Sequence, residues 1–181
     1  MTTRSSPEHA ELRAILSVYL LGHSHDALAH YLMEKSNLTG ARMNLAVVHA
    51  FADVIGELVA QPRLQADRLE ALLNDWAAIP AAEAPVNHPR VILPSAAALA
   101  YGQVAISRPD WWRDEIAKLR RLATDSRWRV RELVAMGVRR DLGDADFVPV
   151  PAHLTAKEYA AKLARSIDRT KATRSEDLAP D

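Results

Sequence analysis

Apolar side chains recur along most of the chain at the spacing of amphipathic helices, and no stretch shows the alternation of a half-buried strand. The first run follows Ser6 and Pro7, a capping residue and a proline that suit the start of a helix. The pattern predicts an all-α chain of about eight helices. They are expected over 7–22, 26–35, the stretch between Gly40 and Pro62, the stretch around 69–76, 95–106, 109–123, 127–141 and 155–170.

Proline-rich and polar stretches subdivide what we expect to be one helical domain over residues 1–170. The N-terminal helices occupy 1–79, and four prolines within 80–94 predict a long crossing rather than a helix. Residues 95–141 hold the next helices, and a capping box at Thr155 opens the last helix, 155–170. The polar end, 171–181, has the composition of a disordered tail.

The composition excludes several classes of protein. The chain has 181 residues and no cysteine, so it can carry neither a disulfide framework nor a cysteine nucleophile. No apolar run is long enough for a membrane span or a signal peptide. We therefore expect a cytoplasmic protein with no membrane partner.

The charge is balanced overall but uneven along the chain. Residues 91–140 carry ten basic and five acidic side chains, and nine of the ten are arginines interleaved with tryptophans. Guanidinium groups bind carboxylates and phosphates, and indoles stack on flat groups. The predicted contact face consists of Trp111, Trp112, Arg113, Arg120, Arg121, Arg127, Arg129, Arg139 and Arg140. In the alternative interpretation, these arginines are ordinary solvated charges and the tryptophans fill the core.

The stretch from Trp111 to Arg140 resembles one HEAT repeat, a two-helix unit of α-solenoids, with Ala117 where many repeats carry a proline. The chain is also similar to bacterial HEAT-repeat proteins, which have no established activity, around 36–45 and 126–136. The resemblance implies an α-solenoid of stacked antiparallel helix pairs. It also implies that Asp125 and Arg131 are structural ladder residues.

The residues favour a non-catalytic interaction or scaffold module that binds a protein or acidic partner through this Arg/Trp-rich face. The alternative is a DNA-binding protein or an enzyme, because the segment also resembles the DNA-alkylation-repeat glycosylases. In such a hydrolase Trp111 and Trp128 would stack on an alkylated base and Glu115 would stabilise positive charge on the sugar. Ile116 stands where a second carboxylate would follow Trp112, and Glu115 could simply pair with a nearby arginine on the same helix.

The sequence gives little support for a metal site, a cofactor site or a catalytic nucleophile. His23, His25, Asp26 and His30 lie close together but lack the spacing of a helical zinc motif, so we expect no metal. No glycine-rich phosphate loop or nucleophile elbow occurs, and no cofactor is expected. A third interpretation is a structural subunit whose exposed alanine-rich helix, 95–106, and terminal helix, 155–170, pack on copies of the same chain. The sequence leaves the oligomeric state open.

Overall fold

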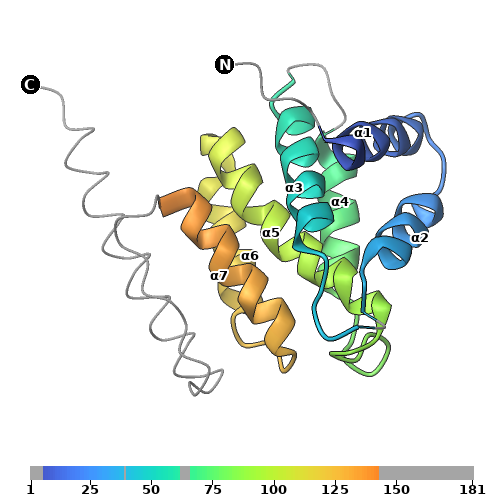
Figure 1. Cartoon of the computed structure of the whole chain (residues 1–181). Helices are drawn as coiled ribbons and strands as arrows, with labels where there is room; N and C mark the ends of the chain where they lie inside the picture. Colours follow the sequence, from blue (N-terminus) through green and yellow to red (C-terminus); the bar gives the residue numbers. More distant parts are fainter. Residues whose placement is uncertain (1–5, 39, 62–65, 143–181) are drawn as a thin grey trace, which may run out of the picture.

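The computed structural model describes residues 6–38, 40–61 and 66–142, and over these residues it is built of helices without a strand. This confirms the all-α prediction (Figure 1). The α-helices are α1 (Pro7–Leu20), α2 (Asp26–Lys35), α3 (Leu45–Val59), α4 (Ala66–Ala77), α5 (Ile92–Ser107), α6 (Trp112–Leu122) and α7 (Trp128–Leu142). Short 3-10 turns, η1 (Pro89–Val91) and η2 (Pro109–Trp111), precede α5 and α6.

Helix α5 is the centre of the fold. Its side chains from Ile92 to Tyr101 are all buried, and it packs against α2, α3, α4, α6 and α7. A helix that is apolar on every side has to be enclosed by its neighbours. The alanine-rich helix is therefore not an exposed surface for packing copies together, and that expectation is wrong: its small side chains allow helices of the same chain to approach closely.

The central position of α5 also bears on the expected repeat architecture. In a solenoid each helix pair contacts only the adjacent pairs. Here α5 touches helices as distant in sequence as α2 and α7, and α7 packs on α5 as well as on α6. The stacked arrangement of antiparallel pairs is not confirmed.

The proline-rich stretch differs from the long crossing that its composition predicts. Residues 80–88 form turns, but the chain is already helical from Pro89, and α5 begins at Ile92 rather than at Ser95. Pro94 is tolerated there because the first turn of a helix leaves its backbone N–H groups without intrahelical acceptors. The backbone N–H of Arg90 donates to His88 Nδ1 at 3.1 Å and helps to start the helical stretch.

The predicted helix 155–170 and the predicted tail 171–181 lie outside the described residues. Among the residues that are described, no helix combines the length and the apolar character needed to cross a membrane.

Candidate functional site

The predicted contact residues divide between the two ends of the α6–α7 hairpin. Helix α6 has 11 residues, or roughly 16 Å of length, and a short turn joins it to α7 (Figure 1). Trp111, Trp112 and Arg113 lie at the start of α6, on the same end as Arg139 of α7. The turn end holds Arg121, Arg127 and Arg129, while the half-buried Arg120 lies on α6 and the side chain of Arg140 is outside the description.

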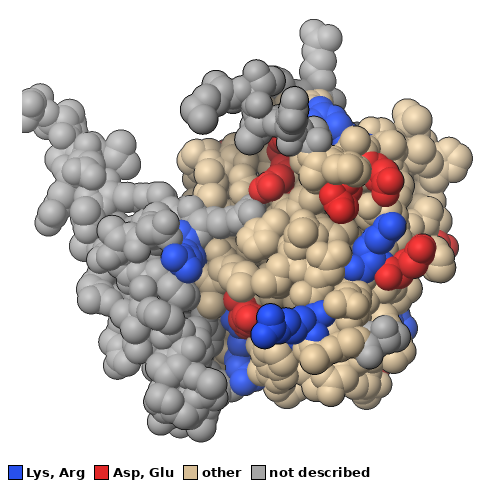
Figure 2. Space-filling view, in the orientation of Figure 1, with Lys and Arg blue, Asp and Glu red and all other residues tan. Residues whose placement is uncertain are grey.

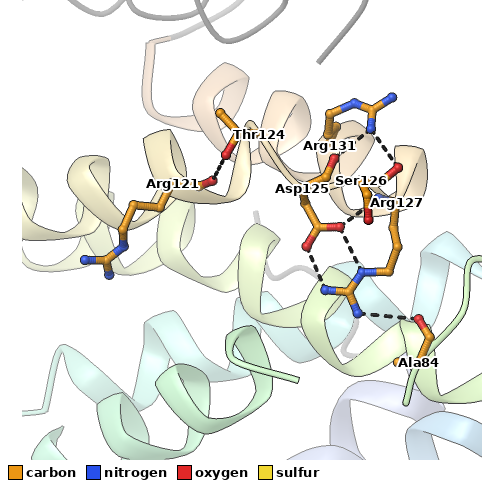
Figure 3. Close-up of polar contacts among 7 residues, drawn as sticks. All are labelled: Ala84, Arg121, Thr124, Asp125, Ser126, Arg127 and Arg131. Atoms are coloured by element: carbon orange, nitrogen blue, oxygen red, sulfur yellow. Dashed lines mark hydrogen bonds and ion pairs between the residues drawn. The ribbon is translucent and has the colours of Figure 1, made fainter. Parts of the chain in front are cut away.

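Asp125 and Arg127 form a buried ion pair in the turn (Figure 3). The guanidinium of Arg127 donates to both carboxylate oxygens of Asp125, from Nε at 2.9 Å and from Nη2 at 2.6 Å. Its Nη1 donates to the carbonyl of Ala84 at 3.4 Å. Burial opposes ionisation of Asp125, but the hydrogen bonds from Arg127 outweigh it and hold the pKa of that carboxyl below its usual value. Arg127 is only 5% exposed, so its guanidinium pairs with groups of the same chain and is not presented to a partner.

Arg129 links α7 to two distant segments. Its Nε donates to the carbonyl of Val86 at 2.9 Å and its Nη2 to the carbonyl of Ala41 at 3.3 Å. The guanidinium also lies 4.4 Å from the centre of the Trp128 ring. With 4% of its surface exposed, Arg129 fastens the segment between α4 and α5 and the segment between α2 and α3 to the start of α7.

Arg131 closes the α6–α7 turn from the other side. Its Nη1 donates to the backbone carbonyls of Asp125 at 2.7 Å and Ser126 at 3.1 Å (Figure 3). The ladder residues that the resemblance implies are thus joined, but through the main chain of Asp125. The carboxylate of Asp125 pairs with Arg127 instead.

These contacts gather three segments at one end of the molecule and leave a few side chains exposed there. We define the loop-end surface by Arg42, Arg121 and Trp128, which are exposed, together with the half-buried Arg131. In the view of Figure 2, blue groups with a red one between them lie in the lower part of the visible face, and blue and red groups are mixed above them. Trp128 is 48% exposed, whereas Trp111 and Trp112 are partly buried against the core.

The three residues considered for a glycosylase do not form one site, because Trp128 lies apart from Trp111 and Glu115. Trp111 and Trp128 lie at opposite ends of the hairpin, stacked with Arg108 and Arg129 respectively. Glu115 is 2% exposed and accepts a hydrogen bond from Lys118 Nζ at 2.6 Å, so it forms an ion pair, with a lysine rather than the expected arginine. Trp111 and Glu115 line the same cavity, but its volume of about 10 Å³ is far too small to admit a base.

Glu115 belongs to a buried polar cluster between α4, α5 and α6. Lys118 Nζ donates to Glu115 and also to Glu70 at 2.7 Å, and it lies 5.1 Å from the ring centre of Tyr101. Burial raises the pKa of Glu115 although Lys118 opposes the shift, and burial likewise raises the pKa of Tyr101. Glu115 Oε2 has no hydrogen-bond partner. Glu115 and Lys118 are buried and their charges face each other, so we regard the cluster as structural.

His23, His25 and His30 are not gathered into a metal site. His25 packs edge-on against Trp76 at 6.1 Å, and His30 lies 3.9 Å from Glu34 on α2. Within the described ranges no group of three or more His, Cys, Asp or Glu residues could hold a metal ion.

A groove of about 620 Å³ runs between α1, α3 and α5. We call it the α3 groove because one face of α3 forms its floor, with the N-terminal turn of α1 and the end of α5 as walls. His9 Nε2 lies 2.9 Å from Glu57 Oε1, and Arg13 pairs with the same carboxylate, so these contacts join α1 to α3 at the rim. Sequence reasoning missed this groove, because its lining is mostly small or singly charged residues that match no motif.

Comparison with known proteins provides no further guide to the site. No protein-family model matches the chain, and no curated protein or solved structure gives a significant match. The function has to be argued from the residues themselves.

Proposed function

We propose that the chain is a non-catalytic helical interaction module that binds an acidic protein partner through the loop-end surface. The exposed indole of Trp128 carries this proposal. Tryptophan and arginine dominate the energetics of protein interfaces, so an exposed indole beside guanidinium groups is a candidate contact residue. Trp128 is the one tryptophan among those described that is exposed to this extent.

The rigidity of this surface supports the proposal. Arg127 and Arg129 fasten three chain segments beneath Trp128 through carbonyl and carboxylate acceptors. Side chains that are already fixed lose little conformational entropy on binding, so a partner gains more net affinity from them.

The local charge favours an acidic partner. Asp125 is neutralised by Arg127, whereas Arg131 donates to carbonyl groups and keeps its full positive charge. Arg42 and Arg121 add two exposed guanidinium groups to the same end of the molecule. Guanidinium groups beside an exposed indole can pair with carboxylates on a protein surface.

The same proposal includes a relation of the α6–α7 hairpin to HEAT repeats. The α6–α7 hairpin would be a HEAT-like unit, which the bonds from Arg131 to the turn carbonyls support. The unit would dock on the central α5 and present its turn to the partner, as the ends of repeat hairpins can do.

The proposal is tested by affinity capture from the native cell extract with the wild-type chain and three variants. Trp128→Ala and Arg121→Glu should each weaken retention of the same acidic protein, and higher salt should weaken it further. Arg113→Glu, an exposed arginine at the other end of the hairpin, is the matched control and should behave as wild type. Equal retention by all four chains would contradict the proposal. Binding of duplex DNA that Trp128→Ala abolishes would favour the DNA-binding alternative instead.

A further inference from the structure

A cavity of about 480 Å³ lies between α2, the end of α4 and the start of α5. We call it the α2–α4 cavity. Helices α2 and α4 each pack on α5, and α2 lies beside the start of α5 in Figure 1. No residue of the loop-end surface lines this cavity, so it is a separate feature of the molecule. Its volume falls within the range of small-molecule sites, roughly 300–1,000 Å³.

Part of the cavity lining is apolar. Ala29 and Met33 lie four positions apart on α2 and therefore share one face of that helix. Ile79 and Leu93 contribute further apolar surface from the ends of two other segments. Small-molecule sites combine such a lining with a few polar groups that fix the orientation of the ligand. The apolar side chains would therefore pack against the body of a small ligand.

The indole of Trp76 also lines the cavity and carries an unused hydrogen-bond donor. Its ring stacks on Phe51 with 5.5 Å between ring centres, and Trp76 is only 2% exposed, yet its Nε1 donates to no group of the described chain. The Nδ1 atom of His25, another lining residue, likewise has no partner there. A buried donor without an acceptor is unfavourable, and folds normally pair such groups. The two nitrogens therefore indicate a place for a polar atom of a ligand.

Two carboxylates give the cavity a negative charge. Asp75 on α4 and Asp26 at the start of α2 line it, and neither forms an ion pair with another described residue. Arg90 is the one Lys or Arg among the described lining residues, and its guanidinium is paired with Glu83 at 3.3 Å. The uncompensated charge at the cavity is therefore that of the two aspartates, which favours a cationic ligand.

We propose that the α2–α4 cavity binds a small amine whose apolar body carries an oxygen acceptor. The ammonium group would pair with Asp75 and Asp26, the body would pack on the apolar lining, and the oxygen would accept a hydrogen bond from Trp76 Nε1. This nitrogen is buried, and the half-buried ring of His25 lies edge-on to the indole at 6.1 Å. The His25 ring would therefore turn aside as the oxygen enters.

Titration of the isotopically enriched full-length chain with tyramine, an amine that carries a phenol, tests this site by nuclear magnetic resonance. The indole N–H signal of Trp76 should move and saturate as its acceptor engages, together with the amide signals of Ala29 and Ile79. Phenethylamine lacks the oxygen, so it should bind more weakly and leave the indole signal nearly in place. Absence of saturable shifts at the cavity, or shifts confined to another surface, would overturn the proposal.

The requirement for a cation separates an amine site from a cavity that accepts any aromatic molecule. The anion para-hydroxyphenylpropionate should bind at least about tenfold more weakly than tyramine. Asp75→Asn should weaken tyramine binding about threefold or more, because it removes one carboxylate of a partly solvated pair. Asp67→Asn changes an exposed aspartate of the same helix outside the cavity and should leave the affinity unchanged. Equal affinities for the two probes, or equal affinities of the two variants, would overturn the proposal.

Discussion

Gly102 of α5 and Gly137 of α7 meet backbone to backbone. A Cβ atom added to Gly102 would lie 2.3 Å from the carbonyl oxygen of Gly137, far inside van der Waals contact. Neither residue has a positive φ, so glycine is required here by space rather than by backbone conformation. This contact sets the distance between the central helix and the hairpin that carries the loop-end surface.

Gly102→Ala is expected to destabilise the protein by about 1–3 kcal/mol or more, because α7 has to move away from α5. Gly137→Ala provides the comparison. Its Cβ would lie 3.0 Å from the carbonyl oxygen of Ala98, a tight contact that a small shift relieves, so the loss should be smaller. Both changes raise helix propensity equally. The difference between the two variants in the free energy of unfolding, measured in urea, therefore reports the cost of the steric clash alone. Equal stability of the two variants would contradict this explanation.

Arg127→Met should destabilise the fold by about 3 kcal/mol, since it leaves the largely buried Asp125 without its cation and releases the carbonyl of Ala84. Arg121→Met, on an exposed arginine of the same hairpin, should change stability by less than about 0.5 kcal/mol. Chemical denaturation of both variants provides the measurement. If the two losses were similar, Arg127 would be an ordinary surface charge after all.

The helices could be predicted largely from the sequence because their signals are local. Helix α2 runs from Asp26 to Lys35 as expected, and the inward-facing valines of α7, Val130, Val134 and Val138, are buried. The centre of the fold could not be predicted in the same way. Alanines on every side of α5 show no preferred face, so the sequence does not distinguish an enclosed helix from an exposed one.

The structural roles of Arg127 and Arg129 could not be predicted from the sequence, for a different reason. Arg127 and Arg129 look like the other basic residues of their segment, but their carbonyl acceptors at Ala84 and Ala41 lie 43 and 88 positions away. Backbone carbonyls are present at every residue and leave no signature in a sequence. Only the folded arrangement separates these two buried arginines from the exposed Arg121.

Asp125 should make stability depend on acidity. Its pKa is lower in the folded chain than in the unfolded chain, so its stabilising contribution is present above the unfolded value, about 3.9, and is lost as the pH falls through the folded value. Asp125→Asn should therefore be less stable than wild type near neutrality, and the gap should narrow as the solution is acidified. Urea unfolding of both chains between about pH 6 and pH 3 checks this. A gap that stays constant over that range would contradict the role given to the carboxylate.

Lys118 should be needed for the stability of the fold only while Glu115 is present. Lys118→Met leaves Glu115 buried without its cation and is expected to cost about 3 kcal/mol near neutral pH, whereas Glu115→Leu combined with Lys118→Met should recover most of that loss. The pKa of Glu115 is raised by burial, so its contribution to stability is present at low pH and is lost as the pH rises through the folded value. The single variant should therefore be closest to wild type in acid. Unfolding free energies of the wild type, both single variants and the double variant give the coupling, and a coupling near zero would show that the two residues act independently.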